Sequence, residues 1–311
     1  MIHFEKKILI VLIGPTAVGK TRVAIELAQW LRTDIISIDS RQFYKEMSIG
    51  TAKPTDKERK TVPHHLVDFL SVTSPYDVKS FEQDALLSVE QVFGQHDYAV
   101  ASGGSGLYAK VLCEGIDDMP QANEAIRQKL GLRYEKEGLE ALINDLKKKD
   151  PTYYQQVDLK NHRRVLRALE VIECSGQPYS LYREKDQSVQ RPFKIIKIGL
   201  NREREELYNR INLRVDLMID KGLIDEAKRL YPFRNTKALQ TVGYQEVFPY
   251  LDGQYDLEEA IRLIKRNSRR YAKRQLTWFR KDADIQWFSA SQPLSTLREE
   301  LQAYLKPILG I

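Results

Sequence analysis

The stretch Ile8-Leu-Ile-Val-Leu-Ile13-Gly14-Pro-Thr-Ala-Val-Gly19-Lys20-Thr21 decides the fold. Six apolar residues precede a glycine-rich segment, and residues 22–31 follow with helical periodicity, so the order is strand, loop, helix. The segment matches the pattern G-x-x-x-x-G-K-[ST], in which backbone amides surround phosphate groups, the lysine adds a charge and the hydroxyl can bind Mg²⁺. The pattern predicts a phosphate or pyrophosphate ligand, without specifying ATP, on Gly14, Pro15, Thr16, Ala17, Val18, Gly19, Lys20 and Thr21.

Three further apolar runs predict strands, at Asp34–Ile38, Tyr98–Ser102 and Phe193–Leu200. Short apolar strands that alternate with helices are typical of a parallel sheet covered on both faces. Ligands of such sheets bind beyond the carboxyl ends of the strands. Asp39 follows the second strand, so we expect its carboxylate beside the glycine loop, as a base or a metal-linked group. The alternative is a structural helix N-cap.

Chain length and composition indicate a globular protein of about two domains. The 311 residues are 42% hydrophobic and 30% charged, and they include two cysteines, which exclude a disulfide framework or a cysteine-rich metal site. A mainly helical pattern runs from Asn123 to about Glu184. The apolar run before Gly14 is too short for a membrane span or a signal-peptide core, so we expect a soluble, cytoplasmic protein with no membrane partner. The expected α/β fold has a core of residues 1–116, a helical insertion of residues 117–192, and a core continuation of residues 193–311 that ends in basic helices.

Positive charge is concentrated near the C-terminus. Arg262–Lys281 holds nine of the 49 basic residues, Arg274 and Arg280 among them, and none of the 43 acidic residues. Ile264, Gln275 and Phe279 recur there at roughly helical spacing, which predicts one helix with an anchored face and a basic face. Such a face suits a polyanion such as nucleic acid, and the alternative is a solvated helix surface.

Arg214 lies on the apolar stripe of another predicted helix, three residues after Ile211 and four before Met218. A buried arginine must be paired or face an anion, because a lone buried charge is costly. Phosphate recognition and a structural salt bridge both satisfy this requirement. His64 and His65 are expected to be loop or core residues, with metal ligation as the alternative. Trp278 and Phe279 are expected to pack in the core, with stacking on bases as the alternative.

Taken together, the motifs resemble the bacterial tRNA dimethylallyltransferase (tRNA isopentenyltransferase) family over about residues 8–290. They occur in the family's order. They are Gly14–Thr21, Asp39–Tyr44, Ile49–Pro54, Pro63–Leu66, Gly103–Tyr108, Asn161–Glu170, Arg210–Arg214, Val242–Gln245 and Lys273–Arg280. The sequence departs from the family at Ser105, where threonine is usual, and in the residues Arg41-Gln42-Phe43-Tyr44.

The resemblance implies a P-loop NTPase-like sheet core and a reaction. A dimethylallyl group would move from dimethylallyl pyrophosphate to the exocyclic amine of the adenine 3′ to the anticodon of tRNA. Lys20, Thr21 and Arg214 would hold pyrophosphate with magnesium bound at Thr21, and Asp39 would act as the general base. The adenine would be flipped into a channel through the core, by a protein expected to be a monomer. The implied tRNA contacts are Asp39, Ser40, Arg41, Gln42, Ser105, Arg127, Arg163, Arg164, Arg167, Gly243, Tyr244, Gln245, Arg274 and Arg280.

Two other functions remain open at this point. The glycine loop alone fits a small-molecule or nucleotide kinase. The basic helix alone fits a non-catalytic RNA-binding protein. An ATPase would normally show an apolar strand that ends in a magnesium-binding aspartate. The third strand instead ends in Gly103-Gly104-Ser105-Gly106.

Overall fold

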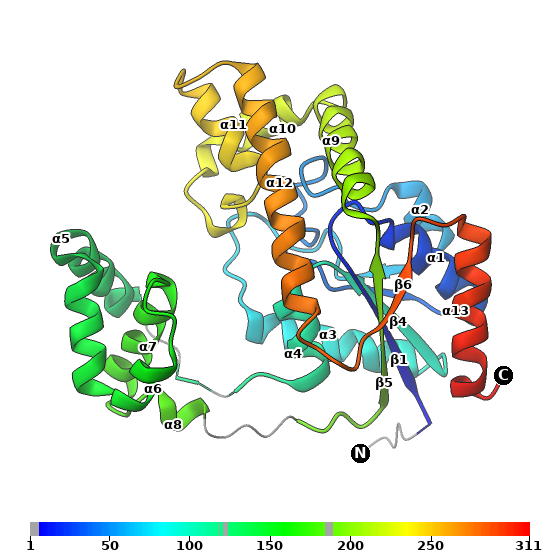
Figure 1. Cartoon of the computed structure of the whole chain (residues 1–311), viewed down its shortest axis with the longest axis horizontal. Coiled ribbons are helices and arrows are strands. Elements are labelled where there is room, and N and C mark those ends of the chain that lie inside the picture. The colour runs from blue at the N-terminus through cyan, green and yellow to red at the C-terminus, as the bar shows by residue number, and fades with distance from the viewer. Residues whose placement is uncertain (1–5, 118, 121–123, 184–188) are drawn as a thin grey trace. The chain divides into compact units, whose positions relative to one another are not determined.

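The computed structural model describes residues 6–117, 119–120, 124–183 and 189–311 (Figure 1). The chain divides into two compact units. The core unit comprises Met1–Glu114 and Gln190–Ile311, and the inserted unit comprises Gly115–Val189. These limits lie near the expected boundaries after residues 116 and 192.

A parallel sheet of six strands forms the centre of the core unit, in the order β3-β2-β4-β1-β5-β6. All six residues of β1 are buried, which explains why its sequence is continuously apolar rather than alternating. The four expected strands are present, and β3 and β6 were not predicted. The strands are β1 (Ile8–Ile13), β2 (Ile35–Ser37), β3 (His64–His65), β4 (Tyr98–Gly103), β5 (Lys194–Asn201) and β6 (Gln286–Ser289).

Strand register gathers the chemically important segments at one edge of the sheet. Ile13, the last residue of β1, is opposite both Gly103 of β4 and Gly199 of β5. Ser37, at the end of β2, is opposite Ser102. The glycine loop, Asp39 and the turn after β4 therefore emerge side by side.

Helices cover both faces of the sheet. One apolar cluster joins the sheet to α1 (Lys20–Leu31) and α13 (Leu294–Leu309). The other joins it to α3 (Val78–Phe93), α4 (Gly106–Glu114), α10 (Leu223–Leu230) and α11 (Tyr244–Leu251). Residues of α9 (Arg204–Asp220) and α12 (Leu257–Phe279) contribute to both clusters, so these two helices pack against both. The short helices α2 (Asp56–Thr61), η1 (Tyr231–Phe233) and η2 (Lys237–Leu239) complete the core unit.

The inserted unit is helical and has its own apolar core. It contains α5 (Glu124–Lys149), α6 (Pro151–Gln156), α7 (His162–Ser175) and α8 (Ser180–Arg183). Gly138, with φ of 77°, interrupts α5. Asp150 is buried and accepts bonds from the amides of Tyr153 and Ser180, at 2.9 and 2.7 Å. Asn123 and Glu184, the expected limits of the helical pattern, lie outside the described residues.

Within the described part of the chain, no helix is both long and apolar enough to span a membrane.

Candidate active site

The glycine loop is bent by residues in the left-handed region of backbone conformation. Gly14 has φ of 152°, and a Cβ there would lie 2.6 Å from the Leu200 carbonyl oxygen. Gly19 has φ of 112° and Ala17 has φ of 62°. Helix α1 then begins at Lys20 with no side-chain cap, so its first amides remain available to an anion. The loop has the geometry of an anion-binding nest.

Two arginines that were not among the predicted site residues donate hydrogen bonds to carbonyl groups of this loop. The Nε of Arg202 donates to the Val18 carbonyl at 2.9 Å, and the Nε of Arg210 donates to the Ala17 carbonyl at 2.9 Å. These bonds fix the two carbonyl groups in place. Arg210 occurs in the motif Arg210–Arg214, one helical turn before Arg214, and that spacing was the available signal.

Lys20 is half-buried at the start of α1, with Arg214 and Asp39 nearby. Its Nζ donates to the carbonyls of Gly14 and Pro15, at 2.9 and 2.8 Å. Burial and the nearby Arg214 lower the pKa of Lys20 to about 7, and Asp39 opposes the shift. A bound anion would stabilise the charged ammonium form of Lys20 and so raise its pKa.

We expect pyrophosphate binding to cause proton uptake at about pH 7.5, because Lys20 with its lowered pKa is partly neutral there and the bound anion raises that pKa. The uptake should vanish as the pH falls well below the pKa of the free protein, where Lys20 is already protonated. Calorimetry in two buffers of different ionisation enthalpy measures it. The control is Lys20→Arg, whose guanidinium stays charged. Equal uptake by both proteins would contradict the expectation.

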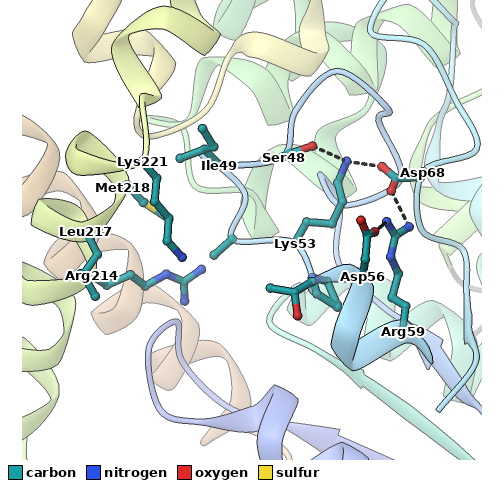
Figure 2. A pocket seen from close by; sticks show the side chains of 13 residues that line it. Ser48, Ile49, Lys53, Asp56, Arg59, Asp68, Arg214, Leu217, Met218 and Lys221 are labelled. Atoms are coloured by element: carbon teal, nitrogen blue, oxygen red, sulfur yellow. Dashed lines mark hydrogen bonds and ion pairs between the residues drawn. The ribbon is translucent and has the colours of Figure 1, made fainter. Parts of the chain in front are cut away.

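Arg214 approaches the loop from α9. Its Nη1 lies 3.3 Å from Thr16 Oγ1, and its guanidinium borders a cavity of about 460 Å³ (Figure 2). Burial lowers the pKa of Arg214, with Asp39 opposing the shift, although an arginine remains charged. The cavity is lined by Ser48, Ile49, Ala52, Lys53, Pro54, Thr55, Asp56, Arg59, Asp68, Arg214, Leu217, Met218 and Lys221.

The carboxylate of Asp39 influences the pKa values of charged and polar groups on the glycine loop, α9 and α12. Its Oδ1 accepts the Arg41 amide at 2.9 Å, so Asp39 stabilises a turn rather than capping a helix. Its carboxylate acts to raise the pKa values of Lys20 in the loop and Arg214 on α9, against the larger effect of burial. Burial raises the pKa of Tyr271 on α12 to about 12, and Asp39 adds to that shift.

The three residues after Asp39 connect this turn to the wall of the cavity. Ser40, Arg41 and Gln42 are all half-buried. Arg41 Nη1 donates to the Ser40 carbonyl at 3.0 Å. Gln42 Nε2 lies 3.5 Å from the carbonyls of Thr51 and Ala52. Lys53 donates to the Tyr44 carbonyl and pairs with Asp68, so in the motif Ile49–Pro54 it has a structural role.

Glu226 on α10 is a buried residue that the sequence predictions missed. Its carboxylate accepts the amides of Ser48, Ile49 and Gly50, at 3.0, 2.9 and 2.9 Å, and the Tyr244 hydroxyl at 2.7 Å. The four bonds compensate the buried charge and hold one wall of the cavity.

Glu226→Gln is expected to lower the free energy of unfolding by about 2–4 kcal/mol, because it places an NH₂ group against buried donors. Denaturant unfolding measures the change. Asp225→Asn, on the exposed face of the same helix, is the matched control and should change stability by less than about 0.5 kcal/mol. Equal stability of the two variants would show that Glu226 does not hold the loop.

Tyr244 belongs to the interior. Its ring is fully buried against Gly50, whose Cβ would lie 2.6 Å from the hydroxyl oxygen, and it bonds to Glu226. The side chain therefore has no surface for the expected tRNA contact. Gly243 is also buried, and Gln245 is exposed.

The turn after β4 owes its glycines to the close approach of other parts of the chain. A Cβ on Gly103 would lie 2.4 Å from the Ile38 carbonyl oxygen, just before Asp39. A Cβ on Gly106 would lie 2.2 Å from the Trp278 ring. Ser105 is half-buried between these glycines. Trp278 itself is 41% exposed, so its expected place in the core is wrong, whereas Phe279 is buried.

The basic helix has the predicted two-sided character. Ile264, Gln275 and Phe279 of α12 are buried, whereas Arg274 and Arg280 are exposed. In the inserted unit, Arg163 and Arg164 are exposed in the first turn of α7. Arg127 and Arg167 both approach Glu170, at 3.8 and 3.4 Å.

The two histidines expected to be structural lie in β3. His65 Nε2 lies 2.8 Å from Asp34 Oδ2, and His64 Nδ1 lies 2.8 Å from the Val62 carbonyl oxygen.

Comparison with known proteins gives consistent matches. Residues 42–282 match the IPP transferase family, and residues 7–74 match the isopentenyl transferase family. The chain is 49% identical to tRNA dimethylallyltransferase 1 of Phocaeicola vulgatus over 91% of this chain and 94% of that protein. It is 50% identical to tRNA dimethylallyltransferase of Cytophaga hutchinsonii over 92% and 93% of the two chains.

Solved structures of similar proteins point to the same family. The tRNA isopentenylpyrophosphate transferase of Bacillus halodurans is 39% identical with a TM-score of 0.72, over 98% of this chain and 97% of that one. A eukaryotic dimethylallyltransferase described as acting on tRNA is 27% identical with a TM-score of 0.82, over 96% and 78%. These likenesses support the P-loop NTPase-like fold and favour prenyl transfer over the kinase and RNA-binding alternatives. This chain belongs to the IPP transferase family of tRNA dimethylallyltransferases.

Proposed function

We propose that this enzyme transfers a dimethylallyl group from dimethylallyl pyrophosphate to the exocyclic amine of the adenine 3′ to the anticodon of tRNA, releasing pyrophosphate. The observation that carries the proposal is the position of Asp39, which follows β2 at the edge of the sheet where the anion loop follows β1. Its charge also acts on Lys20 of that loop and on Arg214. One carboxylate is thus set beside a cationic phosphate site, as an amine acceptor and a pyrophosphate donor require.

Stabilisation of the leaving group is the main task of the loop. Its amides, Lys20 and Arg214 would bind the pyrophosphate, whose negative charge grows as the bond from carbon to oxygen breaks. Preorganised donors in a buried site are usually the largest contribution to catalysis. Arg202 and Arg210 hold the loop carbonyls before the ligand arrives, which lowers the cost of organising the amides.

Magnesium fits the donor set at the loop. Thr21 offers a hydroxyl oxygen in the first turn of α1, and Mg²⁺ favours one or two protein oxygens together with substrate phosphates. Among the described residues there is no group of three or more His, Cys, Asp or Glu side chains that could form an all-protein metal site. When bound, magnesium would neutralise part of the charge on the pyrophosphate.

Asp39 would accept the proton of the attacking amine. The new bond from nitrogen to carbon forms while the bond to pyrophosphate breaks, and the proton passes to the Asp39 carboxylate. The Arg41 amide bond fixes one carboxylate oxygen, Oδ1, and leaves Oδ2 for the amine.

RNA binding would rely on exposed cations. Arg274 on α12 and Arg280, which follows the last residue of that helix, would contact backbone phosphates, and Arg163 and Arg164 of the inserted unit would add further contacts. The adenine is stacked in the anticodon loop, so it would be flipped out to reach Asp39. Ser40, Arg41, Gln42, Ser105 and Gln245 are proposed to contact it or its neighbours, and Arg127 and Arg167 to lie along the RNA. A monomeric, cytoplasmic enzyme is part of the same proposal.

The test mixes the purified enzyme with unmodified tRNA, magnesium and dimethylallyl pyrophosphate labelled in the prenyl group. We expect label in tRNA that carries adenine at the target position, and none when guanine replaces it. RNA affinity should fall steeply with salt. Phosphoryl transfer from ATP without prenyl transfer would contradict the proposal and support a kinase.

A further inference from the structure

Gln275 connects the basic helix α12 to the pyrophosphate loop. Its side chain is 6% exposed, and both ends of the amide are bonded. Oε1 accepts the Thr16 amide at 2.8 Å, and Nε2 donates to the Gly104 carbonyl at 2.7 Å. One side chain therefore holds a loop residue and the turn after β4 together.

The surroundings of Gln275 are shaped to its amide. A Cβ on Gly104 would lie 2.4 Å from Nε2, so a side chain at that position would displace the amide. One turn further along α12, Trp278 packs over Gly106 in a similar way. The helix register is therefore fixed against the turn at two glycines.

Thr16 links Gln275 to Arg214, which is proposed to bind the pyrophosphate. Gln275 holds its amide, while its hydroxyl lies 3.3 Å from Nη1 of Arg214. Displacement of Thr16 would move the start of the loop and a contact of the arginine that faces the leaving group.

Gln275 projects into the protein from the helix whose opposite face carries the cations. Lys273 and Arg274 are exposed, whereas Gln275 is buried. The RNA-facing surface of α12 and the Gln275 contact therefore use different side chains. A change at Gln275 should affect the loop without removing any RNA-facing charge.

We infer that Gln275 is a positioning residue that orders the pyrophosphate loop from the tRNA-binding helix, through Thr16 and Gly104. The inference rests on the proposed function for the identity of the two ligands. It assigns Gln275 to leaving-group stabilisation and not to RNA affinity. Loss of the Gln275 side-chain amide would remove the hydrogen-bond partner of the Thr16 amide and of the Gly104 carbonyl, which is costly.

The test compares wild type with Gln275→Met, which keeps the size of the side chain and loses both bonds. We expect the Kd for pyrophosphate with magnesium to rise about tenfold and kcat to fall about tenfold or more. The Kd for an anticodon stem-loop and the KM for tRNA should stay within twofold. Gly104→Ala keeps glutamine at position 275, but the new Cβ would displace the Nε2 atom of that side chain. This variant should therefore show the same loss of pyrophosphate affinity and kcat with unchanged RNA affinity. Thr277→Ala, exposed on the same helix, is the control.

Two results would overturn the inference. A parallel loss of RNA and pyrophosphate affinity in both variants would show that Gln275 only docks the helix. Unchanged pyrophosphate affinity and kcat would show that the loop does not need it. Should Gln275→Met fail to fold, Gly104→Ala decides between these results. The binding experiments need no prenyl transfer, so absence of transfer by wild type would count against the proposed function alone.

Discussion

Asp39→Asn is expected to lower the rate of prenyl transfer by about 10²- to 10⁴-fold, because an amide cannot accept the proton of the amine. The side-chain oxygen of asparagine can still accept the Arg41 amide, so the turn after β2 should persist. Single-turnover transfer of a labelled prenyl group measures the rate. RNA affinity should change by no more than a few-fold, since Asp39 is one of many contacts.

Asp39→Ala removes both the base and the bond to Arg41, and it should be at least as slow. Asp225→Asn, a change of the same kind at an exposed position, should retain the wild-type rate. A wild-type rate in Asp39→Asn would remove Asp39 from the role of base. A parallel collapse of RNA affinity would indicate that Asp39 mainly organises the RNA site.

Arg214→Ala is expected to lower kcat by about 10²- to 10³-fold and to weaken pyrophosphate binding, since it removes a half-buried cation that is proposed to face the leaving group. Arg214→Lys keeps the charge and loses the planar fork, so its loss should be smaller. Steady-state kinetics and direct titration with pyrophosphate measure the two effects.

The control for Arg214 is Leu213→Ala, because the adjacent leucine on α9 is 61% exposed. It should behave as wild type. If Arg214→Ala binds pyrophosphate and turns over as Leu213→Ala does, the guanidinium has a structural role through Thr16 and does not stabilise the leaving group.

The strands that the sequence predicts are those with enough buried apolar residues to give a local signal. β1 is six buried residues long, and β5 has eight residues, of which four are buried. β3 has only two residues, and β6 is partly exposed at the edge of the sheet. Such elements are fixed by their neighbours in the sheet, which residue pattern alone does not reveal.

A charged residue on the apolar face of a helix marks buried groups at the site. This pattern singles out Arg214. Glu226 shows the same signature, three residues after Leu223 and four before Leu230, and the sequence predictions missed it. Gln275 is separated from Thr16 by 259 positions, so their contact depends on the tertiary fold.

Aromatic residues gave the least reliable predictions. Tyr244 and Trp278 both follow motif glycines or cations in sequence, yet one is buried and the other exposed. The Tyr244 hydroxyl donates a hydrogen bond to Glu226 inside the protein. The Trp278 indole packs against Gly106, which has no side chain to obstruct it, and remains partly exposed. Neither partner is close in sequence.

A crystal structure of the enzyme with an anticodon stem-loop and an unreactive analogue of dimethylallyl pyrophosphate tests the account most directly. We predict both phosphates on the Gly14–Thr21 loop, in contact with Lys20 and Arg214, and the exocyclic nitrogen of a flipped adenine about 3 Å from an Asp39 oxygen. A diphosphate bound away from this loop, or an adenine still stacked in the RNA with Asp39 facing solvent, would contradict it.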